Sequence, residues 1–164
     1  MARVYLSLGS NIDATDNIRL GIRELEKRFG ELRTSNIYRS LAVGFDGPDF
    51  LNLVAAAQTS MSPEAIHDEI ETIHRLAGRS RTTEKFASRP LDIDLLLYDD
   101  LVLDEPPLHL PRSDILEYSF VLKPLVELAP EVVHPLTGKT LAWHWQEHDQ
   151  QRHALRLVAD FLAD

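Results

Sequence analysis

Two aspartates separated by a single residue are the most informative feature of this sequence. Asp92 and Asp94 lie in the run Leu91 to Leu97, whose apolar residues are typical of a buried strand. Because successive side chains of a strand point to opposite faces, both carboxylates lie on one face, about 7 Å apart. Like charges this close destabilise a sheet unless a cation lies between them. Carboxylates and phosphate oxygens are the usual ligands of magnesium, so the pair predicts a metal site.

The other side chains of this strand are apolar and are expected in the core. Strand alternation places four of them on the face opposite the carboxylates: Leu91, Ile93, Leu95 and Leu97. A second interpretation stays open, in which Asp92 and Asp94 are only a solvated face paired with nearby lysines or arginines.

The segment that precedes the aspartates is basic, although the chain as a whole is acidic. Five basic residues lie between positions 75 and 89, namely Arg75, Arg79, Arg81, Lys85 and Arg89. The 164 residues include 17 Lys and Arg against 26 Asp and Glu, which gives a formal charge of −9. This acidity argues against nucleic acid or an anionic membrane as the main partner. Guanidinium groups bind phosphates bidentately, so the basic segment and the aspartates together predict a magnesium–nucleotide phosphate site.

The composition sets further limits on the function. The chain has no cysteine, which excludes disulfides, thiol chemistry and zinc–thiolate sites. No apolar run approaches the roughly 20 residues of a membrane span, and the amino terminus lacks the profile of a signal peptide. We therefore expect a cytoplasmic protein whose residues 1–164 form a single domain.

Hydrophobic periodicity predicts an α+β fold with a ferredoxin-like βαββαβ core and additions at the carboxyl end. The predicted strands are residues 4–8, 31–39, 51–59 and 91–97; one helix has its N-cap at Thr15 or Asp16 and ends at Gly30, a second begins at Ser62-Pro63 and ends at Gly78, and a third spans 119–128. The segment Gly9-Ser10-Asn11 lacks the ending of a Walker loop, and we interpret it as a turn that caps the following helix.

The run Arg89-Pro90-Leu91-Asp92-Ile93-Asp94-Leu95-Leu96 resembles the signature of the 6-hydroxymethyl-7,8-dihydropterin pyrophosphokinases of folate biosynthesis. Other landmarks of that family follow in the right order: Tyr5 to Asn11, Asp49 to Asn52, Gly78-Arg79, and Phe120 to Leu125 with Ala129-Pro130. The resemblance implies transfer of pyrophosphate from ATP to hydroxymethyldihydropterin, with release of AMP. It also implies a ferredoxin-like core, and loops 41–48 and 78–88 that close over the two substrates.

The resemblance assigns roles to individual residues. Asp92 and Asp94 would hold two magnesium ions, and Arg79 and Arg89 would act catalytically on the charge of the transferred group and of AMP. The nucleotide-binding residues would be Arg81, Arg89, Arg112 and Tyr118, and the pterin-binding residues Ser40, Leu41, Val43, Phe50, Asn52 and Phe120. Phe50 and Phe120 would sandwich the pterin, whereas Asn52 would bind its edge. Taken alone, either phenylalanine is more typical of a core.

Several positions depart from the pattern of the family. Arg112 stands where most members have histidine, Tyr118 where a basic residue is usual, and His74 where an acidic residue is expected. Phe86-Ala87-Ser88 replaces an aromatic-Gly-Pro run, and Ser40-Leu41 replaces Thr-Pro. These departures predict an altered nucleotide pocket around an intact central chemistry.

Two alternative functions remain. A paralogue that binds pterin or nucleotide with weak or redirected activity would keep the pocket and lose rate. A glycosyl- or nucleotidyl-transferase with an Asp-X-Asp metal site would have no use for Phe50, Asn52 and Phe120. The expected partners are ATP and the pterin alone, and the expected state is a monomer or weak dimer.

Overall fold

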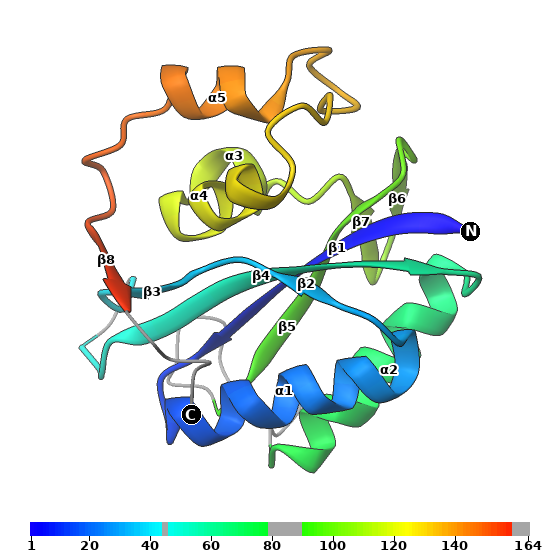
Figure 1. Ribbon diagram of the computed structural model, residues 1–164, viewed down its shortest axis with the longest axis vertical. Coiled ribbons are helices and arrows are strands. Elements are labelled where there is room, and N and C mark those ends of the chain that lie inside the picture. The colour runs from blue at the N-terminus through cyan, green and yellow to red at the C-terminus, as the bar shows by residue number, and fades with distance from the viewer. Residues whose placement is uncertain (44–45, 79–89, 159–164) are drawn as a thin grey trace.

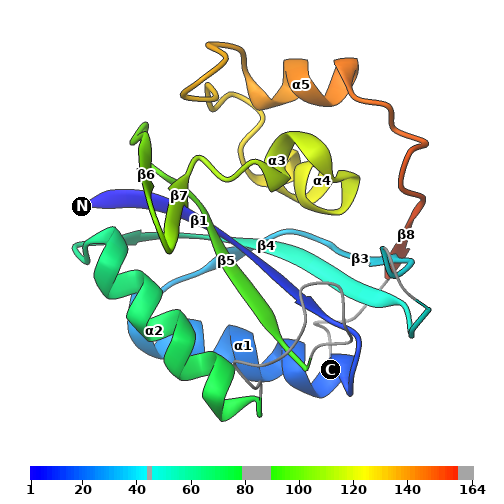
Figure 2. The ribbon, with the colours of Figure 1, turned by 180° about the vertical axis from the view of Figure 1, so that it is seen from behind.

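The fold is built on one antiparallel sheet with helices on both faces (Figures 1 and 2). The computed structural model describes residues 1–43, 46–78 and 90–158. The strands are β1 (Ala2–Ser10), β2 (Arg33–Thr34), β3 (Ile37–Ser40), β4 (Phe50–Thr59), β5 (Asp92–Tyr98), β6 (Leu103–Glu105), β7 (Leu108–Leu110) and β8 (Leu155–Val158). The helices are α1 (Ala14–Phe29), α2 (Pro63–Leu76), α3 (Asp114–Glu117), α4 (Ser119–Leu128) and α5 (Leu141–Glu147).

The strand order confirms the predicted ferredoxin-like core. The main sheet runs β5-β1-β4-β3-β8, with β2 also paired to β4, and β6 and β7 form a separate hairpin. The predicted strand over residues 31–39 is two short strands instead. Ser35 separates them, because its hydroxyl accepts a hydrogen bond from the Val54 amide at 2.9 Å and its own amide donates to the Val54 carbonyl. This side-chain bond takes the place of a regular ladder contact.

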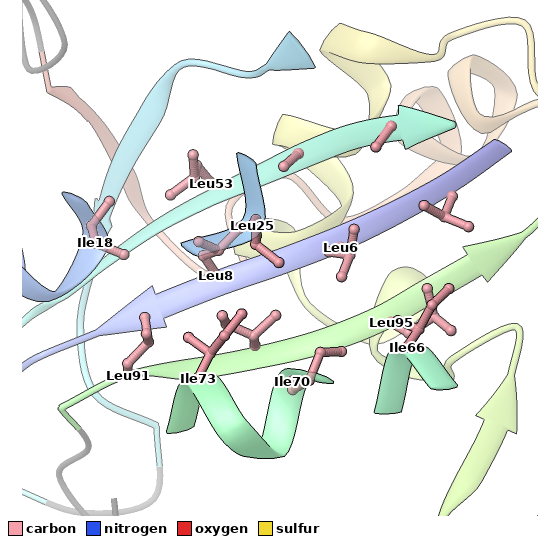
Figure 3. Close-up of a cluster of buried hydrophobic side chains, with 14 of the residues drawn as sticks. Leu6, Leu8, Ile18, Leu25, Leu53, Ile66, Ile70, Ile73, Leu91 and Leu95 are labelled. Carbon is pink, nitrogen blue, oxygen red and sulfur yellow. The ribbon is translucent and has the colours of Figure 1, made fainter. Parts of the chain in front are cut away.

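The first face of the sheet is covered by α1 and α2, whose apolar residues form the main core (Figure 3). Leu6, Leu8, Leu53, Leu91 and Leu95 from the strands meet Ile18, Leu25, Ile66, Ile70 and Ile73 from the helices. Burial of such side chains contributes about 1.5–3 kcal/mol each, which fixes the helices against the sheet. In the described part of the chain, no helix is long and apolar enough to cross a membrane.

The predicted helix ends agree with the structure except at the start of α1, and the predicted helix over 119–128 is α4. Gly30 ends α1 with φ of 79°, Gly78 follows α2 with φ of 83°, and Ser62 caps α2 by accepting a hydrogen bond from the Ala65 amide at 3.2 Å. The predicted N-cap of α1 at Thr15 or Asp16 is wrong. The helix begins at Ala14 after Asp13, which adopts a left-handed conformation with φ of 43° and makes no side-chain cap.

A bulge in β5 overturns one expectation about its side chains. Leu91, Ile93 and Leu95 face α1 and α2 as predicted, but Leu97 packs on the opposite face with α4. Tyr5 pairs with Leu97 whereas the next residue of β1 pairs with Leu95, so Leu96 is inserted and the alternation shifts by one. Both Leu96 and Leu97 therefore join the second core.

The second face of the sheet is covered by α3 and α4, with α5 beyond them (Figure 1). On α4, Glu127 accepts hydrogen bonds from the Tyr38 hydroxyl and from the Asn36 amide, which fixes the helix to β3. Burial and the neighbouring carboxylate raise the pKa of the Tyr38 phenol, so it stays a donor.

A buried histidine joins α2 to the strand of the aspartates. His74 is 4% exposed, and its Nε2 accepts a hydrogen bond from the Ile93 amide at 2.9 Å. Its Nδ1 lies 3.3 Å from Oε1 of Glu71. Ile93 lies between Asp92 and Asp94, and β5 is at one edge of the sheet order. On this edge strand, His74 therefore provides the hydrogen-bond acceptor for the backbone amide that lies between the two aspartates.

We expect that His74→Leu lowers the free energy of unfolding by about 1–3 kcal/mol, because it leaves the buried Ile93 amide without an acceptor. His74→Gln keeps an acceptor oxygen near the place of Nε2 and should lose less than half as much. Urea unfolding of the two variants provides the measurement. Equal losses in both would mean that packing of the ring, and not the hydrogen bond, is what His74 contributes.

Candidate functional site

Four strands meet in register where β1 ends. Gly9 of β1 pairs with Asp92 on one side and with Asn52 on the other, and Asn52 pairs with Tyr38 of β3. Directly paired residues of an antiparallel sheet project to the same face. Asp92, Asn52 and Tyr38 therefore share one face, which is the face opposite α1 and α2.

Gly9 has no side chain, so nothing projects from β1 between the Asp92 carboxylate and the Asn52 amide at this position. A Cβ atom at this position would lie 3.3 Å from Oδ1 of Asn52 and 3.8 Å from Cδ1 of Phe50. The first distance is tighter than ordinary van der Waals contact, so a side chain here would displace the Asn52 amide. Gly9, predicted above only as part of a turn, thus lies where any side chain would press on the Asn52 amide.

The buried amide of Asn52 is held by β3. Asn52 is 6% exposed, and its Nδ2 donates a hydrogen bond to the Ser40 hydroxyl at 2.8 Å. Ser40 is buried as well and pairs with Phe50 across the two strands. Two further predicted pterin residues follow Ser40 out of the sheet, with Leu41 70% exposed and Val43 partly buried. The structure thus brings Ser40, Phe50 and Asn52 together, and the Ser40 hydroxyl accepts a hydrogen bond from the Asn52 side chain.

The carboxylate pair is where the alternation of β5 predicted it. Asp92 and Asp94 are both partly buried on the face of Asn52. Arg112 lies beside them, with Nη1 3.8 Å from Oδ1 of Asp94 and Nη2 3.1 Å from Oδ1 of Asp114. Its amide also donates to the Leu96 carbonyl of β5 at 3.1 Å. One protein cation therefore already faces this pair, as the alternative interpretation of the motif required.

The charge of Arg112 is secured by its surroundings. Burial lowers its pKa, but the charges of Asp94 and Asp114 raise it by more, and the net pKa is raised. Its Nε is buried without a hydrogen-bond partner. Arg112 therefore presents a permanent positive charge next to Asp94 and retains an unused donor.

The residues present fit a magnesium ion that is completed by substrate. In the described ranges, no group of three or more His, Asp or Glu side chains could enclose a metal by itself. Magnesium commonly takes one or two carboxylates and fills its octahedron with water and phosphate oxygens. The chemistry of Asp92 and Asp94 matches that donor set.

Aromatic side chains gather at the start of α4. The rings of Tyr118 and Phe120 are stacked, with centroids 4.9 Å apart and planes inclined by 20°. Burial and the carboxylates of Glu117 and Asp114 raise the pKa of Tyr118, so the phenol stays neutral. A neutral phenol does not supply the positive charge of a basic residue. Phe120 is partly buried against the second core. Both interpretations of this ring, core packing and ligand contact, are compatible with its position.

The interpretation of Gly9-Ser10-Asn11 as a helix-capping turn is wrong. Gly9 and Ser10 belong to β1, and the buried Ser10 hydroxyl donates a hydrogen bond to the Pro90 carbonyl. The Asn11 side chain donates to the Pro48 carbonyl at 3.2 Å. Pro48 lies two residues before β4, and Pro90 lies two residues before β5. The side chains of Ser10 and Asn11 thus bind the backbone where the chain re-enters the sheet after each long loop. No local pattern in the sequence indicates these two hydrogen bonds.

Part of the predicted site lies outside the described residues. Arg79, Arg81 and Arg89 belong to this part, so their catalytic and nucleotide-binding roles stay predictions. The described part contains the carboxylate pair with Arg112, the Ser40–Asn52 pair with Phe50, and the stack of Tyr118 and Phe120.

Comparison with known proteins identifies the relationship. The family model described as 7,8-dihydro-6-hydroxymethylpterin-pyrophosphokinase matches residues 5–130. The 2-amino-4-hydroxy-6-hydroxymethyldihydropteridine pyrophosphokinase of Aquifex aeolicus is 37% identical over 143 residues, which cover 86% of this chain and 89% of that protein. The folic acid synthesis protein fol1 of Pneumocystis carinii is 35% identical over 154 residues, 89% of this chain, but the match spans only 20% of that longer protein.

The same relationship is visible in the fold. A crystal structure of Plasmodium falciparum HPPK-DHPS superposes with a TM-score of 0.73 at 14% identity, over 89% of this chain and 42% of that one. At this identity the likeness supports the fold alone, whereas the sequence relatives and the family model establish kinship. The chain belongs to the 7,8-dihydro-6-hydroxymethylpterin-pyrophosphokinase family.

Proposed function

We propose that this chain carries out the pyrophosphokinase reaction of its family on the sheet face that bears Asp92 and Asn52. In that reaction the hydroxymethyl oxygen of 6-hydroxymethyl-7,8-dihydropterin attacks the β-phosphorus of ATP. The bond from that phosphorus to the oxygen bridging to the α-phosphorus breaks, AMP leaves, and the hydroxyl proton is released. The observation that carries the placement is the register Asp92–Gly9–Asn52, which sets a carboxylate and a buried amide on one face across three strands.

The acceptor side is built from Asn52 and the two phenylalanines. Asn52 is held by Ser40 at 2.8 Å, so its amide is fixed before a ligand arrives. A pterin ring offers donors and acceptors along its edge and two apolar faces, which suit an amide and aromatic rings. We assign Asn52 to the edge, Phe50 and Phe120 to the faces, and the backbone of Ser40, Leu41 and Val43 to further edge contacts.

The phosphate side is built from carboxylates and arginines. Asp92 and Asp94 would hold magnesium, two ions in this proposal, and magnesium when bound neutralises phosphate charge and makes a coordinated hydroxyl more acidic. Arg112 adds a fixed positive charge beside Asp94, and Arg81 and Tyr118 belong to the proposed nucleotide pocket. Transfer of a phosphoryl group needs positioning and charge stabilisation more than covalent help from the protein.

The proposal treats residues 1–164 as one pyrophosphokinase domain that acts in the cytoplasm as a monomer or weak dimer on two small molecules. Purified protein, ATP, magnesium and hydroxymethyldihydropterin provide its test, with AMP and the pyrophosphorylated pterin separated by chromatography. Binding of both substrates without formation of either product would favour the non-catalytic paralogue.

For the carboxylates, we expect Asp92→Asn and Asp94→Asn each to lower kcat by about a hundredfold or more, because each removes a carboxylate ligand from the proposed magnesium site. The free energy of unfolding should stay within about 1 kcal/mol, since both side chains are partly exposed. Asp104→Asn, on the exposed hairpin of β6, is the matched control. Turnover within a few fold of wild type in either site variant would contradict the metal assignment.

The loop arginines are expected to act on the transition state. Arg79→Ala and Arg89→Ala should each lower kcat by about tenfold or more, with a smaller rise in the KM for ATP. Arg75→Ala, at an exposed position of α2, serves as the control. A change confined to KM in both variants would reduce these arginines to ground-state phosphate contacts.

The departures in the nucleotide pocket can be reversed. Tyr118→Arg adds a cation where the family usually has one, and it should tighten the binding of magnesium–ATP by about tenfold, the size of one charge-assisted phosphate contact. Arg112→His removes the charge beside Asp94 and should weaken it. Calorimetry at constant magnesium measures both. Unchanged or weaker binding in Tyr118→Arg alone would mean that Arg112 already compensates for Tyr118.

A further inference from the structure

Two buried side-chain nitrogens in the described part of the chain lack a hydrogen-bond partner, Nε of Arg112 and Nδ1 of His153. Buried polar groups without partners are rare in folded proteins, and each one calls for a physical explanation. Arg112 belongs to the candidate site. His153 lies far along the chain, between α5 and β8, and none of the functions considered so far uses it.

The fold carries His153 to the acceptor side of the site. Its ring lies 5.8 Å from that of Phe120, edge to face at 71°, and 5.6 Å from that of Tyr118. Two residues later, Leu155 of β8 pairs with Ser40 of β3, whose hydroxyl accepts the hydrogen bond from Asn52. Figures 1 and 2 both show β8 beside β3, below the helices of the second face. His153 is therefore tied to Phe120 by contact and to the Ser40–Asn52 pair by the register of β8.

The charge state of His153 suits a neutral ligand. Burial lowers the pKa of this histidine, the charges of Arg152 and His148 lower it further, and Glu117 and Asp149 only partly oppose them. The imidazole is therefore neutral at neutral pH, and Nδ1 can either donate or accept a hydrogen bond. A phosphate would favour a cation at this place, whereas an uncharged heterocycle with a polar edge does not require one.

We propose that His153 is a further binding residue for the pterin, which it contacts beside Phe120 and to which Nδ1 supplies one hydrogen bond. The assignment rests on the proposed function of the site. A half-turn of the imidazole about its Cβ–Cγ bond exchanges the places of Nδ1 and Cδ2 without moving the ring plane. This motion brings the buried nitrogen to the other side of the ring and leaves the contacts with Phe120 and Tyr118 in place.

Two substitutions separate the hydrogen bond from the ring. His153→Phe keeps an aromatic ring against Phe120 and removes both nitrogens. His153→Asn keeps a hydrogen-bonding atom near the place of Nδ1 and removes the ring. His109→Phe is the matched control, because His109 is an exposed histidine of β7 on the separate hairpin.

The test measures the Kd of 6-hydroxymethylpterin by its fluorescence, with and without magnesium and a non-hydrolysable ATP analogue, and the KM of both substrates. His153→Phe should raise the pterin Kd and KM about three- to tenfold, the size of one neutral hydrogen bond, with the KM for ATP unchanged. His153→Asn should recover at least half of this loss in affinity, and His109→Phe should behave as wild type.

The outcomes separate this proposal from the function on which it rests. A wild-type protein that neither binds the pterin nor releases AMP overturns the proposed function and His153 with it. If the wild type is active and both His153 variants bind the pterin as tightly as it does, the function stands and the assignment of His153 falls. A raised KM for ATP alone also overturns the assignment, since it places His153 at the nucleotide. An equal loss of affinity for both substrates with a lowered unfolding midpoint overturns it as well, since the role of His153 is then structural.

Discussion

The constraint on which the rest of the site depends is the placement of two like charges on one face of an edge strand. β5 has a full partner on one side only, so its other side must be held by groups from elsewhere. His74 accepts a hydrogen bond from the Ile93 amide between the two aspartates, and the backbone amide of Arg112 donates one to the Leu96 carbonyl, two residues beyond Asp94. Arg112 then turns its guanidinium toward Asp94. The strand can therefore carry adjacent carboxylates because its backbone is fixed independently of their charges.

A second consequence follows from the way β1 ends. β1 supplies Gly9, which lies between the Asp92 carboxylate and the Asn52 amide, and Ser10, which donates a hydrogen bond to the Pro90 carbonyl; Asn11, directly after β1, donates one to the Pro48 carbonyl. The last two residues of β1 and the residue that follows them therefore shape the candidate site between Asp92 and Asn52 and hold the segments that lead into β4 and β5. A change at any of them would act on both β4 and β5, because β1 lies between these two strands.

The sequence predicted those features that depend on local periodicity. Alternation in β5 placed Asp92 and Asp94 on one face, and the helix stripe of Ile66, Ile70 and Ile73 identified the core. The prediction from sequence failed where pairing between distant strands decides which face a side chain takes or where a strand breaks. Leu97 changes face because of a bulge against Tyr5, and the break at Ser35 depends on a hydrogen bond to Val54. The proximity of His153 to Phe120 arises from the pairing of β8 with β3, more than a hundred residues apart in the chain, and local patterns carry no signal for it.

The departures from the family pattern divide into two physical kinds. His74 stands where an acidic residue is usual, yet its Nε2 accepts a backbone hydrogen bond, which a carboxylate oxygen could equally do. Replacement of an acidic residue by histidine can therefore retain the hydrogen-bond acceptor at this position. Tyr118 differs, because a phenol with a raised pKa carries no positive charge and its ring is already stacked on Phe120. The ring at this position therefore contributes aromatic packing against Phe120 and no positive charge. Arg112 lies between Asp94 and Asp114 and so places a fixed positive charge beside these carboxylates, a charge that an incoming polyphosphate would share in the proposed reaction.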